Sequence, residues 1–352
     1  MKKYIKRIID YLAIQISYRI NDQLLHAVES ILPKIWIDFN EKIQAEIVKI
    51  SDEKNQSLII NYMIEGIYPS ILVVKKNGKR IFLDPRDPYI TVHYLLNLSW
   101  EPQLTSVFTR VFQEFKSGHS GLNSRAIFID CGANVGLHSL SAAELGYEVF
   151  AFEPDPVTFK HLQLNAAING ITITSEKLAV SDVEGKLQFM IDSKSSGMSG
   201  LSKSESGIGR FAGKIDLDDR FRHTSVDSIT LSKYFADKFI ADQASLLFLK
   251  IDTEGAEGEV LQGAYRLIEQ FDSCVIVCEF RLDNQNLLRQ YEKIVKNEIS
   301  KGKFVKMQLL KFLEKPITIN HLDSGTWGRN GDGDLVLFLS SQNIFSESEV
   351  AP

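Results

Sequence analysis

The chain has 352 residues, enough for one large domain or two of ordinary size. Its hydrophobic share of 44% and charged share of 24% are those of a globular protein that buries a core in water. The net charge of −5 gives no electrostatic reason to expect a nucleic-acid partner.

Amphipathic helices are the first elements that the sequence predicts. Isoleucine and leucine recur at helical spacing over residues 5–16, and a second amphipathic stretch covers residues 21–50. Such helices can lie on a membrane surface, form a homodimer or pack on the protein's own core. We favour packing within the protein or against a second copy, and we do not favour membrane contact.

Export from the cytoplasm is not expected. No run approaches the ~20 apolar residues of a membrane span, and Lys6, Arg7 and Asp10 interrupt any signal-peptide core. The three cysteines lack the spacing of a zinc site, so we expect reduced thiols in a cytoplasmic protein.

A β-hairpin and a helical region come next. Two β-rich runs within residues 70–85 flank Asn77-Gly78, the strongest short hairpin signal. Helical spacing returns over residues 90–115, and a polar, Gly/Ser-rich stretch at 116–125 predicts a linker near a domain boundary.

Strands and helices alternate from residue 126 onward. We expect strands at the runs AIFID, EVFAFEP, ITITSEKLAV, SLLFLKID and SCVIVCEF, with helices between them, then a helix over about 284–300 and two closing strands at 303–312 and 333–340. Such alternation implies a parallel sheet covered by helices on both faces. The Ser/Gly/Lys-rich residues 193–221 predict either an acceptor lid or a structureless loop without a role.

The turn after the strand AIFID is the first candidate site. Ligands of open parallel sheets bind outside the carboxyl ends of the strands. The turn runs from Asp130 through Gly132 to Gly136, and glycine lets the backbone approach a ligand closely. Its G-x-x-x-G spacing lacks the dinucleotide fingerprint, which disfavours an NAD-dependent enzyme. An acid before the turn suits a ligand with positive charge, such as an ammonium or a sulfonium.

The next strand ends at Glu153, seventeen residues after Gly136. Taken alone, Glu153 is equally compatible with a ribose ligand and a solvated strand end. Together with the glycine turn, it favours a carboxylate that binds both ribose hydroxyls of an adenosine. A sulfonium joined to an adenosine is S-adenosylmethionine.

The fourth strand of the predicted sheet ends in a cluster of charges, Lys250, Asp252, Glu254 and Glu257. Neighbouring carboxylates raise one another's pKa, so one of them can accept a proton from a hydroxyl. We interpret Glu257 only as an acid that complements the dipole of the following helix. A divalent metal held by Asp252, Glu254 and Glu279 is an alternative, because hard cations prefer oxygen ligands, but it is not favoured.

These motifs together resemble the FkbM-type, class I S-adenosylmethionine-dependent methyltransferases. The segments that carry the resemblance are DCGANVGLHS, FEPDPVTFKHLQLNAAING, LAVSDVEG and KIDTEGAEGEVLQGA. The resemblance implies an α/β, Rossmann-like fold with a seven-stranded, mostly parallel sheet whose last strand is antiparallel. It implies methyl transfer to a hydroxyl of a sugar or secondary metabolite. We therefore expect an N-terminal accessory region at 1–98, a methyltransferase domain at 99–345 and a tail at 346–352.

The resemblance also assigns site residues. It implies that the methionine end of the cofactor is lined by Asp130, Gly132, Asn134 and Gly136. It implies that Glu153 holds the ribose and that Ala179 to Asp182 flank the adenine.

Our mechanistic hypothesis gives the proton-accepting role to Asp252, with Lys250 and Glu254 orienting it. His138, His223 and His321 are reserve bases. The rival hypothesis is a non-catalytic module that keeps the cofactor pocket and engages a protein partner through its N-terminal helices.

Overall fold

The structure is a computed structural model. It describes residues 71–75, 77–84, 87–118, 124–192, 199–201, 221–238, 245–281, 284–309, 316–317 and 332–341. The predicted helices within residues 1–50, His321 and most of the 193–221 segment lie outside the described residues.

The predicted hairpin is present, and two helices follow it. These elements are β1 (Ile71–Val74), β2 (Arg80–Leu83), α4 (Pro88–Asn97) and α5 (Pro102–Gly118). The side chain of Asp87 caps α4 by accepting a hydrogen bond from Ile90 N at 3.0 Å. The helical spacing over residues 90–115 divides into two helices because Leu98 ends the first in a left-handed conformation and Pro102 begins the second.

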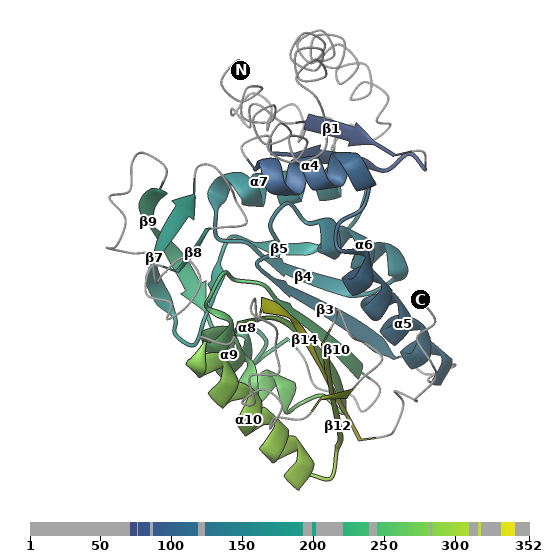
Figure 1. The fold of residues 1–352 in the computed structure, drawn as a ribbon, viewed down its shortest axis with the longest axis vertical. Coiled ribbons are helices and arrows are strands. Elements are labelled where there is room, and N and C mark those ends of the chain that lie inside the picture. Colours follow the sequence, from purple (N-terminus) through teal and green to yellow (C-terminus); the bar gives the residue numbers. More distant parts are fainter. Residues whose placement is uncertain are drawn as a thin grey trace, which may run out of the picture.

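A mixed sheet forms the centre of the molecule (Figure 1). In spatial order its strands are β5 (Thr174–Glu176), β4 (Glu148–Phe152), β3 (Arg125–Cys131), β10 (Ser245–Ile251), β11 (Ser273–Arg281), β14 (Asp332–Ser340), β12 (Phe304–Leu309) and β13 (Pro316–Ile317). The first five strands are mutually parallel, and β14 runs antiparallel between β11 and β12. This confirms the predicted seven-stranded, mostly parallel sheet with an antiparallel last strand, and the two-residue β13 adds an eighth strand at its edge.

Helices cover both faces of the sheet because its strands are apolar on both sides. The helices after α5 are α6 (Leu137–Leu145), α7 (Pro156–Ile168), α8 (Leu231–Tyr234), α9 (Glu257–Ile268) and α10 (Gln285–Ser300). In β10, Leu247 and Leu249 face a core shared with α9 and α10, whereas Leu246 and Phe248 face the core under α5. Within the described residues, no helix is long and apolar enough to cross a bilayer.

A second sheet lies beside the first, in the order β6 (Ala179–Val180), β9 (Phe221–Ile229), β7 (Gly185–Asp192) and β8 (Gly200–Leu201). This sheet was not predicted from the sequence, and residues 193–221 were expected to form either an acceptor lid or a structureless loop. β7 pairs with β9 over eight residue pairs, from Gly185↔Ser228 to Asp192↔Phe221. The strands were missed because their partners are far apart in the chain.

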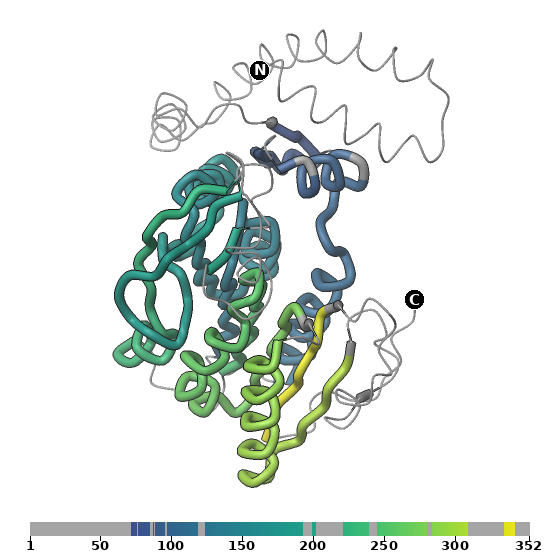
Figure 2. Tube along the Cα trace, turned by 60° about the vertical axis from the view of Figure 1, so that its left-hand side comes forward, coloured from purple at the N-terminus to yellow at the C-terminus, as the bar shows by residue number. Residues whose placement is uncertain are grey.

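The hairpin is attached to α7 by two asparagine side chains one helical turn apart. Asn165 accepts from Phe82 N at 2.6 Å and donates to Phe82 O at 3.0 Å, while Asn169 makes the same pair of bonds with Arg80. In Figure 2, α4 lies near the upper end of the described residues, and the chain descends from it to α5. The hairpin and α4 therefore share a core with α6 and α7, and the boundary proposed at residues 98 and 99 stays a prediction.

Candidate functional site

The glycine turn begins where β3 ends and brings the backbone against the end of β10. Gly132 has a φ of 77°, and a Cβ there would lie 1.8 Å from the carbonyl oxygen of Asp252. Gly136 has a φ of 87°, and its Cβ would lie 2.4 Å from Leu162. Only glycine permits both the backbone conformation and the close approach at these positions.

Glu153 follows β4 and is tied to the glycine turn. Its Oε2 accepts from Asn134 N at 2.9 Å, and its Oε1 accepts from Asp155 N at 2.8 Å. Burial and the charge of Asp155 raise the pKa of Glu153 to about 8, although the two N–H groups oppose the shift. Each carboxylate oxygen has a further lone pair for a hydroxyl donor.

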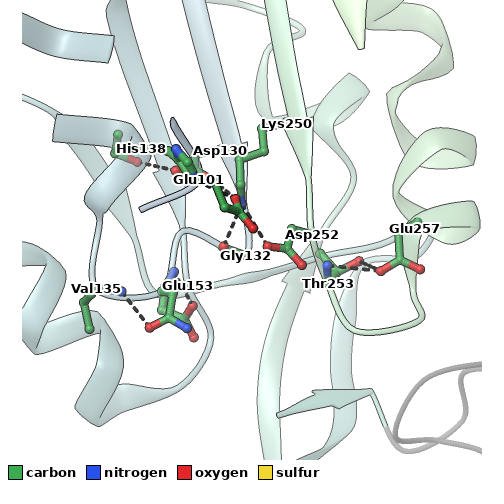
Figure 3. Close-up of polar contacts among 12 residues, drawn as sticks. Glu101, Asp130, Gly132, Val135, His138, Glu153, Lys250, Asp252, Thr253 and Glu257 are labelled. Atoms are coloured by element: carbon green, nitrogen blue, oxygen red, sulfur yellow. Dashed lines mark hydrogen bonds and ion pairs between the residues drawn. The ribbon is translucent and has the colours of Figure 1, made fainter. Parts of the chain in front are cut away.

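Lys250 is the centre of a buried charge cluster (Figure 3). Its Nζ lies 3.1 Å from Asp130 Oδ1 and 3.4 Å from Asp252 Oδ2, and it donates to Gly132 O at 3.3 Å. Burial disfavours the ammonium, but Asp130, Asp252 and Glu101 outweigh that cost and raise the pKa of Lys250. Lys250 thus remains charged and joins the glycine turn to the end of β10.

Asp130 is fully buried in this cluster. Its Oδ2 accepts from Ser139 Oγ at 2.6 Å, and its other oxygen faces Lys250. A buried ion pair with added hydrogen bonds is costly to open. The predicted contact of Asp130 with a bound cofactor stays a prediction, and the structure gives the carboxylate two protein partners.

Asp252 is the more open acid of the cluster, with 40% of its side chain exposed. Its pKa is raised by loss of hydration and by the charges of Glu101 and Asp130, against the opposing charge of Lys250. A carboxylate with a raised pKa that borders open space is suited to accept a proton.

Glu101, which directly precedes α5, was not among the site residues predicted from the sequence. Its Oε2 lies 2.8 Å from Nε2 of His138, and its φ is 40°. The ring of His138 is buried, so it reaches the cluster through Glu101. No local pattern identified Glu101; a polar residue just before Pro102 was the available signal.

The loop after β10 is organised by Glu257, which the sequence analysis treated only as a partner of the helix dipole. Glu257 does begin α9, but it is also fully buried. Its Oε1 accepts from Thr253 N, from Thr253 Oγ1 and from Gly255 N, the last at 2.8 Å. This side chain therefore fixes the loop that carries Glu254, whose φ is 56°.

These elements surround one cavity that opens to solvent. Its polar side chains are those of Asn134, Glu153, Ser199, Asp252, Thr253 and Glu254, and Gly132 adds backbone. An apolar wall of the cavity comes from the second sheet and the segment before it, and it includes Leu178, Val180, Phe189 and Leu201.

The predicted site residues divide into two groups. Those that line the cavity are Gly132, Asn134, Glu153, Ala179, Asp252 and Glu254. Those placed elsewhere among the described residues are Asp130, Gly136, His138, Asp182, His223 and Lys250.

Three acids considered as metal ligands are close together. Carboxylate oxygens of Asp252, Glu254 and Glu279 lie within 4.8 Å of one another. Acidic side chains also gather without an ion, so this proximity does not assign a metal.

The strand order, with a glycine turn after β3 and an acid after β4, defines a class I methyltransferase-like α/β fold. A sequence model described as "Methyltransferase FkbM domain" matches residues 130–300. Methyltransferase sdnD of Sordaria araneosa is 30% identical over 176 residues, which are 45% of this chain and 67% of that protein. The chain therefore belongs to the FkbM methyltransferase family.

Other similarities are more distant. The 31-O-demethyl-FK506 methyltransferase FkbM of Streptomyces tacrolimicus is 28% identical over 39% of this chain, and the match spans 58% of that protein. Among solved structures, Trm5b from Pyrococcus abyssi has 12% identity and a TM-score of 0.35 over 77% of this chain and 55% of its own. The METTL16 methyltransferase domain has 10% identity and a TM-score of 0.37 over 77% and 87%. The fold assignment rests on strand order and family instead.

Proposed function

We propose that this methyltransferase uses S-adenosylmethionine to methylate a hydroxyl group of a sugar or secondary metabolite. The observation that carries the proposal is that Gly132, Glu153 and Asp252 line the same cavity. Transfer to oxygen is supported by the name of one relative, a 31-O-demethyl-FK506 methyltransferase.

The residues that line the cavity suit the chemistry of S-adenosylmethionine. The oxygens of Glu153 can accept hydrogen bonds from the two ribose hydroxyls, as in other folds that bind adenosine after the second strand. The apolar wall around Val180 and Phe189 suits the adenine ring. The missing side chain at Gly132 lets the backbone approach the ligand closely.

Asp252 is the proposed general base. The cofactor, when bound, supplies a methyl group activated by a sulfonium. The acceptor hydroxyl must lose its proton as its oxygen is methylated, and Asp252 takes that proton at a carboxylate oxygen. General bases of this kind contribute roughly 100- to 10,000-fold to the rate.

Lys250 orients the site rather than touching the substrate. Its ammonium joins Gly132 O, Asp130 and Asp252, so it aligns the glycine turn with the proposed base. Such alignment of reacting groups is a large part of catalysis in displacement reactions. Glu254 borders the same cavity and is proposed to help orient the acceptor.

Calorimetric titration with S-adenosylhomocysteine tests the cofactor assignment. We expect micromolar binding by the intact protein and its loss in Glu153→Ala. Glu148→Ala is a matched control, because Glu148 lies at the start of the same strand and is exposed. Absence of binding by the intact protein would exclude the proposal, and binding without turnover on any hydroxyl acceptor would favour the non-catalytic module.

Asp252→Asn tests the base assignment once a screen of sugars and natural-product intermediates identifies an acceptor. We expect S-adenosylhomocysteine binding to persist while turnover falls by roughly 100-fold or more. Full turnover in this variant would show that Asp252 is not the base.

A further inference from the structure

Glu101 occupies a strained backbone position at the edge of the charge cluster. Its φ of 40° is in the left-handed region, and it precedes Pro102, which further restricts its backbone. Among the described residues, the others with positive φ apart from glycine are Leu98, Asn134 and Glu254. Asn134 and Glu254 line the cavity, so strain of this kind is concentrated near the site, as is common where residues act on ligands.

The side chain of Glu101 is anchored at one carboxylate oxygen and is partly exposed. Oε2 lies 2.8 Å from Nε2 of His138, whose side chain is only 6% exposed, whereas the side chain of Glu101 is 37% exposed. Figure 3 shows Glu101, Asp130 and Lys250 converging beside Gly132. His138 therefore holds Glu101 close enough to Lys250 and Asp252 for their charges to interact. Asp252 and Gly132 line the cavity, so Glu101 lies beside it.

The acids of this cluster are not equivalent. Although burial opposes ionisation, His138, Lys250 and His93 lower the pKa of Glu101, so it remains an anion. The pKa of Asp252 is raised, which suits a proton acceptor. Asp130 is engaged by Lys250 and Ser139. Acids whose environments separate their pKa values commonly have separate roles.

Building on the proposed function, we propose that Glu101 is a cofactor-binding residue whose carboxylate receives the α-ammonium group of S-adenosylmethionine. In this assignment Asp252 accepts the proton of the acceptor hydroxyl, and Asp130 forms the ion pair that holds Lys250 in place. The amino-acid end of the cofactor would then be recognised by a residue that precedes the family-matched segment at 130–300.

The test is a double-mutant cycle between Glu101 and the ligand amino group. Calorimetry would compare S-adenosylhomocysteine with its deaminated analogue, in the intact protein and in Glu101→Gln. The intact protein is expected to prefer the amino-bearing ligand by roughly 10- to 100-fold, the range for a hydrogen bond between charged groups. Glu101→Gln should lose that preference and bind the deaminated analogue about as well as the intact protein does.

Glu114→Gln is the matched control, because Glu114 lies in α5 and pairs with Arg110 away from the cavity. It should retain the preference of the intact protein. A preference that persists in Glu101→Gln, or equal losses for both ligands, would overturn the proposal while the cofactor assignment stood. Failure of the intact protein to bind either ligand would overturn both.

A second measurement needs no variant of Glu101. In ¹⁵N-histidine NMR spectra of the intact protein, the Nε2 signal of His138 can be assigned by its absence from His138→Gln. We expect S-adenosylhomocysteine to shift this signal and the deaminated analogue to leave it unchanged. Only the ligand with an ammonium group would form an ion pair with the Glu101 carboxylate, which also contacts His138 Nε2. Identical spectra with the two ligands would contradict the proposal even if Glu101→Gln failed to fold.

Discussion

Glu153, the proposed ribose ligand, is a buried acid that lowers the stability of the folded protein when it ionises. It is 7% exposed, and burial together with Asp155 raises its pKa to about 8. An acid whose pKa is raised by folding destabilises the protein as the pH increases, because the unfolded chain ionises first. For Glu153 this loss begins near the ordinary value of 4.5 and is complete above about 8.

Glu153→Gln is therefore expected to raise the melting temperature of the ligand-free protein more at about pH 8.5 than at about pH 5.5. The amide carries no charge to bury at the higher pH. The same variant should lose affinity for S-adenosylhomocysteine. Glu148→Gln, at the exposed start of β4, should show no such pH dependence, and a gain in melting temperature that is the same at both pH values would contradict the explanation.

A comparison of alanine substitutions at Gly132 and Gly78 distinguishes the cost of a steric clash from the cost of backbone strain. Both have positive φ, but a Cβ at Gly78 meets nothing within 4 Å, whereas one at Gly132 would lie 1.8 Å from Asp252 O. Gly78→Ala should cost about 1–2 kcal/mol of unfolding free energy. Gly132→Ala should cost at least ~2 kcal/mol more and abolish nucleoside binding. Urea denaturation measures both, and equal costs would mean that the turn can move away from β10.

At the scale of elements, α7 connects the hairpin to the glycine turn. Besides its two bonds to Phe82, Asn165 donates to Val135 O at 2.8 Å. This one buried side chain thus satisfies backbone groups of β2 and of the glycine turn, which would otherwise be unpaired.

Asn165→Ala is expected to lower the unfolding free energy by about 2 kcal/mol or more, since three hydrogen bonds of a fully buried amide are lost. Asn97→Ala is the control, because its amide bonds His93 O on the surface, and we expect a change within about 0.5 kcal/mol. Chemical denaturation monitored by fluorescence measures both. Similar small effects would mean that water replaces the contacts of Asn165.

At the scale of the whole molecule, residues from both predicted regions build one core. The apolar residues of this shared core are Val73, Ile81, Leu83, Ile90, Tyr94, Val135, Leu140 and Ala166. The first five come from the hairpin and α4, and the last three from the glycine turn, α6 and α7. Separating the regions would expose apolar surface on both sides.

Removal of residues 1–98 is therefore expected to yield a chain that aggregates or unfolds at lower denaturant concentration than the intact protein. Size-exclusion chromatography and urea denaturation of the 99–352 chain test this. A monomeric 99–352 chain that binds S-adenosylhomocysteine as tightly as the intact protein would instead support the boundary predicted from sequence.

The sequence by itself determined the order of the main elements and two positions of the cavity. Alternating apolar runs predicted β3, β4, β10 and β11 because strand and helix periodicities are local properties. The glycine turn and Glu153 were predicted for the same reason, since the turn needs positive φ and the acid follows the next strand directly.

Only the tertiary structure decided which side chains meet. The pairing of Glu101 with His138, the fixation of Asp130 by Lys250 and the attachment of β2 to α7 each join residues from different elements. The second sheet likewise depends on pairing between β7 and β9. Such contacts depend on how elements pack, and packing leaves no periodic pattern in the sequence. Backbone sterics and the alternation of apolar residues are local properties, so they can be recognised from the sequence.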